Sequence, residues 1–477
     1  METELKFVFE ATALSGLERR LARGTQTPMR ACYFDSADDR LASAAIALRL
    51  RREGAQWVQT LKARATGPLA RLEHECPRGG GAAMPPIDLA LHAGTPAGAA
   101  LAAALGDAAL EPIYETDVLR THRVVRAGGA RVEIALDIGE LRAGTAVEPI
   151  REIEFELLDG PLCGLLETAA QWSLDHDLWL DLRSKSERGM RLARGVRRTA
   201  ATKAVVPRLA KPMSPEAALR AMVAACIEQV LPNAAELTAG LGTPEHLHQL
   251  RVGLRRLRSA FRLLGDFFPE ATARWEPALR TLFTAVGEAR NLDVLRAELL
   301  PALQAAGAPA LSLAEVPAVD VGALLRRPGV SLLWLELLAF ALEPSPASQP
   351  VLRAKGVLDR RLSKLERRLR AEAAGFARFG DAECHRLRKR LKRLRYGLEL
   401  AAPILPRGHT EVLPTLRPLL DLLGRFNDAC QAQDFIQAHA AEPGRAFALG
   451  WLAAHRERLR GEAQAALVPW LKLRQDG

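Results

Sequence analysis

The apolar residues of this 477-residue chain change their spacing once, near residue 205, and this change limits most strongly how the chain can fold. Before it, short runs alternate apolar and polar residues as half-buried strands do, whereas after it apolar residues recur with the helical period of 3.6. Between the two patterns, Gly195–Glu216 is basic, has three prolines and lacks apolar periodicity, which is typical of a linker. We therefore expect an α+β multidomain protein, with a mostly antiparallel β domain over residues 1–200, a linker over 201–214 and an all-α domain over 215–477.

The charge of the chain is divided in the same way. The chain has 66 Lys and Arg against 56 Asp and Glu, but residues 1–205 hold 27 basic and 28 acidic residues. The C-terminal part therefore carries the whole surplus of positive charge. Such a surplus favours a polyanion as partner, although a merely solvated basic surface would give the same count.

Other features of the sequence exclude some classes of protein. The longest weakly charged run, Pro328–Pro344, is too short to span a bilayer and contains Glu336, and no N-terminal segment resembles a signal peptide. The six cysteines have no CxxC or other ligand spacing, so we expect reduced thiols and neither a disulfide framework nor a zinc site. Histidines outside the helical motifs, such as His74 and His92, have no partner that the sequence reveals. Together these features predict a cytoplasmic protein without a membrane segment.

Strands of the N-terminal half carry charges of both signs on one face and apolar residues on the other. In the first run, Glu2, Glu4 and Lys6 share a face opposite Leu5 and Phe7. Four later runs repeat this alternation, and their charged faces hold Arg49 and Arg51; Arg71, Glu73 and Glu75; Glu133 and Asp137; and Glu152, Glu154 and Glu156. A sandwich with salt-bridged outer faces would explain one such strand, but five favour a barrel with a charged interior. Clustered carboxylates suit Mg²⁺ or Mn²⁺ and Arg and Lys suit phosphate oxygens, so this interior is expected to hold a metal–polyphosphate chelate.

The N-terminal part resembles the CYTH, or triphosphate tunnel metalloenzyme, family through the ordered motifs ETELK, RLR, TLKAR, RLEHE, DVLRTHR, EIALDIG, REIEFEL and SKSERG. The resemblance implies an eight-stranded antiparallel tunnel that hydrolyses or cyclises triphosphate compounds with Mg²⁺ or Mn²⁺. By position, it assigns the metal to Glu2, Glu4 and two glutamates of the strand at 152–156, for which we take Glu152 and Glu154. It assigns phosphate binding and catalysis to six basic residues, which are Lys6, Arg49, Arg51, Lys62, Arg120 and Lys185. Alternation places Arg120 and Arg123 on opposite faces of their strand, so only one of them should point inward.

The C-terminal half contains one basic helical motif twice. The first copy forms a stripe of His248, Arg251, Arg255 and Arg258, and the second a stripe of His385, Arg388, Lys392 and Arg395, each opposite a stripe of leucines. Each histidine lies 39 residues before a glycine, Gly287 or Gly424, which indicates an internal duplication of about 137 residues. We expect a duplicated helical bundle with pseudo-repeats at about 215–343 and 350–477, whose two basic helices face each other across one cationic channel.

The paired pattern HQLRVGLRRLR…GEARNLD and HRLRKRLKRLRY…LLGRFND resembles the CHAD (conserved histidine α-helical) domain over roughly residues 210–477. The resemblance implies binding of inorganic polyphosphate, and by position it assigns this binding to His248, Arg251, Arg255, Arg256, Arg258, His385, Arg388, Lys389, Lys392 and Arg395. One departure is Asn291, where the family more often has Asp. Tyr396 is the one tyrosine in either basic helix, so few aromatic rings are available to stack on nucleic-acid bases. The sequence therefore favours phosphate chains over nucleic acid as the ligand.

The two resemblances together predict a metal-dependent inorganic triphosphatase. Its tunnel would hydrolyse tripolyphosphate while its helical domain binds polyphosphate, in the cytoplasm or in association with polyphosphate granules. Two alternatives stay open: a non-catalytic polyphosphate-binding or granule-associated protein, and an organic triphosphatase or adenylate cyclase.

Overall fold

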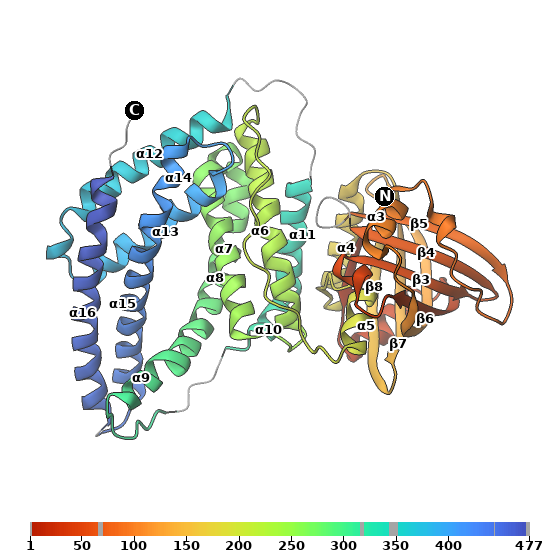
Figure 1. Cartoon of the computed structure of the whole chain (residues 1–477), viewed down its shortest axis with the longest axis horizontal. Helices are drawn as coiled ribbons and strands as arrows, with labels where there is room; N and C mark the ends of the chain where they lie inside the picture. The colour runs from red at the N-terminus through yellow and green to blue at the C-terminus, as the bar shows by residue number, and fades with distance from the viewer. Residues whose placement is uncertain (1, 65–69, 315–318, 343–351, 443, 474–477) are drawn as a thin grey trace. The chain divides into compact units, whose positions relative to one another are not determined.

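A computed structural model describes the chain except for residues 1, 65–69, 315–318, 343–351, 443 and 474–477 (Figure 1). The side chains of Glu2, Arg64, Ala70, Arg71 and Thr410 also lie outside the described part. The chain forms two compact units, of which the first comprises Met1–Thr202, Leu231–His246 and Gly322–Phe340 and the second comprises Lys203–Val230, Leu247–Val321 and Ala341–Gly477. Two short parts of the helical region, Leu231–His246 and Gly322–Phe340, therefore belong to the same unit as the β domain.

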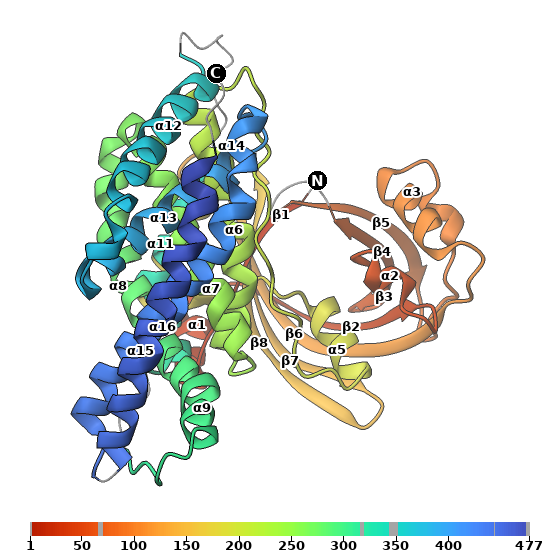
Figure 2. The ribbon, with the colours of Figure 1, turned by 60° about the vertical axis from the view of Figure 1, so that its left-hand side comes forward.

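Nine strands of the first unit form one antiparallel sheet. They are β1 (Glu2–Val8), β2 (Thr25–Asp35), β3 (Ile46–Glu53), β4 (Gln56–Arg64), β5 (Ala70–Gly80), β6 (Glu111–Ala127), β7 (Ala130–Ala143), β8 (Ala146–Asp159) and β9 (Trp179–Leu180). Their order is β5-β4-β3-β2-β6-β7-β8-β1-β9, and β1 also pairs with β5, so the first eight strands close into a barrel. Figure 2 shows these strands curving around an open centre. The predicted antiparallel barrel is confirmed.

Most apolar strand residues point outward, and short helices lie on that side, which are α1 (Leu14–Arg20), α2 (Arg40–Ser43), α3 (Pro96–Leu105) and α4 (Leu162–His176). The helix α5 (Lys185–Ala193) instead packs against the inner face, where Gly189 lies against the Tyr114 ring and Lys185 lines the cavity. Leu5 of β1 and Phe155 of β8 are fully buried, and Phe155 packs edge-on against Trp172 of α4 at 5.9 Å between ring centroids. On the opposite wall, Leu48 and Leu61 pack with α2 and α3. Because successive side chains alternate across a strand, the charged residues between these apolar ones face the interior.

The C-terminal region is helical, as predicted. Its main elements are α6 (Pro215–Thr238), α7 (Pro244–Leu264), α8 (Pro269–Val294), a π-helical turn η4 (Leu295–Leu299), α9 (Leu300–Ala305), α10 (Val321–Leu325), α11 (Pro328–Leu342), α12 (Ala354–Ala373), α13 (Asp381–Ala401), α14 (Arg407–Glu411), α15 (Leu413–His439) and α16 (Gly444–Lys472). Among the described residues, none of these helices combines the length and the apolarity needed to cross a membrane.

The two basic motifs occupy equivalent places in the helical region. The first lies in α7 and its glycine, Gly287, lies in α8, whereas the second lies in α13 and its glycine, Gly424, lies in α15. A side chain at Gly287 would meet the Arg251 guanidinium at 3.3 Å, and one at Gly424 would meet that of Arg388 at 3.9 Å. Each glycine therefore makes room for the arginine that stands three residues after the motif histidine, which supports the predicted duplication.

Candidate functional site

The barrel encloses a cavity of about 400 Å³ whose lining carries both signs of charge. Its cationic lining consists of Lys6, Arg49, Arg51, Lys62, Arg120 and Lys185, together with His122. Its acidic lining consists of Glu4, Glu53, Glu73, Glu75, Glu133, Asp137, Glu154 and Glu156. The structure thus brings the six basic residues that the sequence selected into one cavity.

Three carboxylates gather deep in the barrel wall. Asp137 on β7 and Glu152 on β8 are direct partners in the sheet register, and Glu154 follows two residues later on the same face of β8. One ligand atom from each lies within 4.8 Å of the others, and the exposed fractions of Asp137 and Glu152 are 1% and 0%. Carboxylates this close and this buried require cations between them.

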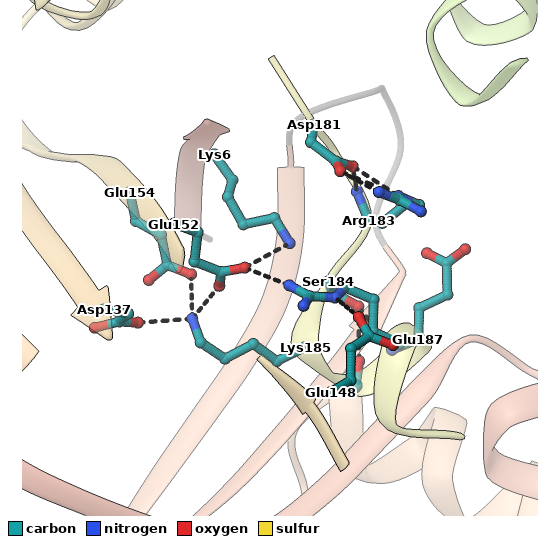
Figure 3. A network of polar contacts seen from close by, with 12 residues as sticks. Lys6, Asp137, Glu148, Glu152, Glu154, Asp181, Arg183, Ser184, Lys185 and Glu187 are labelled. Carbon is teal, nitrogen blue, oxygen red and sulfur yellow. Dashed lines mark hydrogen bonds and ion pairs between the residues drawn. The ribbon is translucent and has the colours of Figure 1, made fainter. Parts of the chain in front are cut away.

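Lys185 supplies one of these cations. It is the first residue of α5, whose N-terminus is capped by the Ser184 hydroxyl, so the helix start places the ammonium group over the cluster. Its Nζ lies 2.7 Å from Asp137 Oδ2 and 2.8 Å from Glu154 Oε1, and it also contacts Glu152 (Figure 3). Burial alone would lower the pKa of Lys185, but the three carboxylates outweigh it and hold that pKa well above its usual value.

Arg120 supplies the second cation. Its guanidinium binds both oxygens of Asp137 at 2.7 and 2.6 Å and reaches Glu154 at 2.5 Å. Although burial opposes ionisation of Glu154, Lys185 and Arg120 hold its pKa well below the usual carboxyl range. Arg123, three residues later, points to the outside of the barrel, where it donates to the backbone oxygen of Arg20 at 3.2 Å.

The facing wall is formed by basic residues of β3 and β4. Arg49 donates to the Tyr33 hydroxyl at 3.2 Å, and burial, which would raise the pKa of that phenol, is outweighed by the neighbouring guanidinium. Lys62 pairs with Glu73 at 3.2 Å, and Arg51 pairs with neighbouring glutamates of β3 and β5. These three cations line the cavity together with their partners.

Basic residues of α7 and α13 form a second site within the second unit. Arg251 and Arg255 of the first motif interact electrostatically with Arg388 and Lys392 of the second. Burial and these like charges lower the pKa of Arg251 to about 9, and the same two causes lower the pKa of Lys392 well below its usual value. The four cations thus face one another, and an anion placed among them would relieve their mutual repulsion.

Residues of the neighbouring helices support this cluster. The guanidinium carbons of Arg251, Arg255 and Arg258 lie 5.1, 5.1 and 5.3 Å from the ring centre of Phe283 on α8. Asp428 of α15 interacts electrostatically with Arg251, Arg388 and Lys392. The Phe283 ring and Asp428 therefore contribute to holding these basic side chains in place.

Comparison with known proteins assigns both halves of the chain. Residues 1–190 match the CYTH domain, and residues 221–437 match the CHAD domain. The chain carries a CYTH domain followed by a CHAD domain. The CYTH family is a metal-dependent family of triphosphatases, and its acidic cluster is present here as Asp137, Glu152 and Glu154.

Individual relatives match parts of the chain. The inorganic triphosphatase of Haemophilus influenzae is 30% identical over 165 residues, which are 33% of this chain and 44% of that protein, so less than half of that relative is matched. The CHAD domain from the plant Ricinus communis is 27% identical with a TM-score of 0.47, over 58% of this chain and 98% of that chain. A candidate adenylyl cyclase from Hippeastrum with a dominant triphosphatase activity is 17% identical with a TM-score of 0.28, over 41% of this chain and 96% of that chain.

The sequence missed part of the CYTH cavity. Asp137 was noted as a charged strand residue but not as a ligand, although its alternation with Ile134, Leu136 and Ile138 already placed it on the inner face. Glu152 lies behind the cavity lining, where Arg188 binds it at 2.9 Å and Lys6 lies 3.7 Å away. The side chain of Glu2 lies outside the described part of the structure.

In the CHAD domain, one of the ten predicted residues, Arg256, is bound to other parts of the domain. Arg256 has an exposed fraction of 2%, and its guanidinium donates to Gln229 Oε1 at 2.9 Å and to the Val205 backbone oxygen at 2.5 Å. It follows Arg251 by five residues, which turns it about 140° around the helix and away from the stripe. These contacts give Arg256 a structural role, and its part in binding polyphosphate stays a prediction.

The structure also places the predicted residues at the ends of the two stripes. Arg258 pairs with Glu276 at 2.7 Å, and Arg395 pairs with Glu399 at 2.8 Å, so both have acidic partners. Lys389 is exposed. At the start of the second stripe, the His385 ring contacts the Asn427 side chain.

Proposed function

We propose that the CYTH tunnel hydrolyses inorganic triphosphate with Mg²⁺ or Mn²⁺, and that the CHAD domain binds inorganic polyphosphate. The observation that carries the proposal is that one cavity of about 400 Å³ is lined by six Lys and Arg side chains and lies against a buried cluster of three carboxylates. A metal–triphosphate chelate has the complementary charges, with a divalent cation at one side and phosphate oxygens at the other.

The donor set of the acidic cluster fits a hard divalent cation. Asp137, Glu152 and Glu154 offer carboxylate oxygens alone, which Mg²⁺ and Mn²⁺ prefer over softer ions. These three carboxylates would hold the cation, and the bound ion would supply positive charge against the phosphate oxygens. Lys185 and Arg120, which now bind the same carboxylates, are then available to the phosphates.

Among the residues of the chain, the Lys and Arg side chains that line the cavity would contribute most to catalysis. Phosphoryl transfer passes through a loose transition state, so the protein mainly positions the substrate and stabilises charge. Arg49, Arg51 and Lys62 line one side of the cavity and would hold the phosphate chain by its oxygens. Arg120 and Lys185 would stabilise the charge that develops on the leaving diphosphate. The mechanism needs no covalent nucleophile.

The CHAD cluster favours a long phosphate chain as its ligand. Its four facing cations, Arg251, Arg255, Arg388 and Lys392, come from both repeats, so a linear polyanion can contact them in turn. Such binding releases counterions and weakens steeply with salt. We propose that this domain recruits polyphosphate in the cytoplasm or at polyphosphate granules.

Phosphate release from tripolyphosphate, ATP, thiamine triphosphate and long-chain polyphosphate, each with Mg²⁺ or Mn²⁺, tests the enzyme assignment. We expect tripolyphosphate to be the best substrate and Arg120→Gln to lower kcat by at least about 100-fold. Arg123→Gln is the matched control, since this residue of the same strand points outside the barrel. Absence of phosphate release from tripolyphosphate with either metal would refute the proposal, and a preference for ATP or thiamine triphosphate would favour an organic triphosphatase.

A non-catalytic polyphosphate-binding protein is the second candidate, because the CHAD cluster is complete without the tunnel. It predicts that the chain binds polyphosphate but hydrolyses none of the four substrates. Neutralising Arg251, Arg255, Arg388 and Lys392 should abolish that binding, whereas Arg120→Gln should leave it unchanged.

A further inference from the structure

Two histidines and a cysteine meet on the outer face of the CYTH barrel, away from the cavity. His74 and Cys76 lie two residues apart on β5, and His92 ends the short helix η2 (Leu89–His92). His74 Nδ1 lies 2.9 Å from His92 Nδ1 and 3.6 Å from Cys76 Sγ, and all three ligand atoms lie within 4.8 Å of one another. We propose that His74, Cys76 and His92 form a binding site for a transition metal, with Zn²⁺ as its ion.

The observed spacing fits a tetrahedral zinc centre. With bonds of about 2.0–2.1 Å to nitrogen and about 2.3 Å to sulfur, tetrahedral angles require about 3.6 Å between sulfur and nitrogen and about 3.3 Å between two nitrogens. The distance from Cys76 to His74 already has this value, and the two imidazoles need to part by about 0.4 Å. Cysteine sulfur and histidine nitrogen are ligands that Zn²⁺ takes in proteins, whereas the cavity cluster offers carboxylate oxygens alone. Three protein ligands leave the fourth position to water.

Gln59 on β4 affects metal binding at this site through a hydrogen bond to His92. Its Oε1 accepts from Arg78 at 2.6 Å and from the Asp88 amide at 3.0 Å, so its amide orientation is fixed. Its Nε2 therefore donates to His92 Nε2 at 2.9 Å, which favours the tautomer with the proton on Nδ1. A metal on Nδ1 needs the other tautomer, so Gln59 opposes binding, and a carboxylate in its place would support it.

The site is connected to the tunnel wall through one strand. On β5, His74 and Cys76 point outward, whereas Glu73 and Glu75 line the cavity. A metal that joins β5 to η2 would therefore hold this part of the wall in place. The site does not depend on the proposed enzymatic function, because its ligands and those of the cavity differ in residues and in chemistry.

Titration of the full-length protein with Co²⁺ in excess Mg²⁺ tests the proposal, since cobalt bound to a thiolate gives a near-ultraviolet charge-transfer band. We expect one equivalent of this band, its displacement by Zn²⁺, and its loss in Cys76→Ser and in Cys76→Ala. Cys163→Ser, which alters an exposed cysteine, is the matched control and should keep the band, as should Glu154→Gln in the tunnel. Absence of the band in the unaltered protein, or its survival in the folded Cys76 variants, would overturn the proposal.

Variants of the histidines and of Gln59 test the rest of the ligand set. His74→Ala and His92→Ala should each weaken Co²⁺ binding at least about 10-fold, and Gln59→Glu should tighten it by about 10-fold. Circular dichroism verifies that each variant is folded. If Gln59→Glu does not bind Co²⁺ more tightly, His92 is not a ligand, and the three-residue site is refuted.

Discussion

Replacing Lys185 with glutamine tests whether this lysine and the proposed metal ion bind the same carboxylates. The side chain has an exposed fraction of 12% and contacts carboxylates with exposed fractions of 1%, 0% and 15%. At 2.7 Å and an effective dielectric constant of about 20, one such contact has a Coulomb energy of about 6 kcal/mol before desolvation is subtracted. Removing one partner of a buried ion pair costs about 3–5 kcal/mol net, and we expect this loss of barrel stability in Lys185→Gln without metal.

Divalent cations should offset the loss in the variant. A metal at about 100 times its dissociation constant stabilises the folded state by about 2.7 kcal/mol, which is most of the expected deficit. In the unaltered protein the Lys185 ammonium competes for the same carboxylates, so Mg²⁺ should stabilise it less than it stabilises Lys185→Gln. Lys62→Gln is the matched control, because this tunnel lysine pairs with Glu73 at 3.2 Å and is more exposed, so its loss should cost about 1 kcal/mol or less.

Hydrogen exchange measures these effects locally. Some amides of β7 and β8 exchange only when the barrel opens. In metal-free Lys185→Gln these amides should exchange at least about 100-fold faster than in the unaltered protein, because each 1.4 kcal/mol of lost stability raises the open population tenfold. Added Mg²⁺ should restore most of their protection, and amides of the CHAD helices serve as an internal reference. Equal stabilisation of the unaltered protein and the variant by Mg²⁺ would show that Lys185 and the metal do not share the carboxylates.

Three further predictions follow from the same contacts. The fold lowers the pKa values of Asp137 and Glu154, so these ionised carboxylates stabilise the folded barrel fully above about pH 4.5. This stabilisation is lost as the pH falls through the lowered pKa values, and acid unfolding followed by circular dichroism would reveal the loss. Lys392→Gln should stabilise the CHAD domain by about 1 kcal/mol, because it removes a buried like charge, while weakening polyphosphate binding in a filter-binding assay. Arg256→Ala should instead lower the unfolding temperature, since it removes the hydrogen bond that Arg256 donates to the buried Gln229 Oε1, and the salt dependence of polyphosphate binding should not change.

The barrel could be predicted from the sequence because its strands repeat one rule. Residues such as Glu4 and Lys6 alternate with fully buried Leu5 and Phe7, and a period of two leaves only one choice of inner face. The rule does not give the register between strands. That Asp137 stands opposite Glu152, and so completes the carboxylate cluster, depends on the pairing of β7 with β8 and could not be read from either strand alone.

Longer-range contacts explain what else the sequence did not reveal. His74 and Cys76 are close in the sequence, but His92 reaches them only because η2 folds back over β5. In the CHAD domain the spacing of the basic stripe placed Arg251, Arg255, Arg388 and Lys392 on matching faces of two helices. It did not distinguish Arg256, whose role depends on Gln229 of α6 and on a backbone carbonyl of the preceding segment.

The two phosphate sites proposed for this chain differ in whether their cations are paired with carboxylates. In the tunnel, cations such as Arg120 and Lys185 are already paired with carboxylates, so a ligand must exchange one set of partners for another. Because the ligand replaces carboxylates that already neutralise these cations, few counterions are released when it binds. The affinity of the tunnel for its ligand therefore depends on the geometry of the site and on the metal. In the CHAD cluster, Arg251 and Lys392 repel their neighbours until an anion arrives, so charge itself drives binding. The tunnel is therefore suited to selecting a short chelate, whereas the helical cluster is suited to capturing a phosphate chain with little regard to its length.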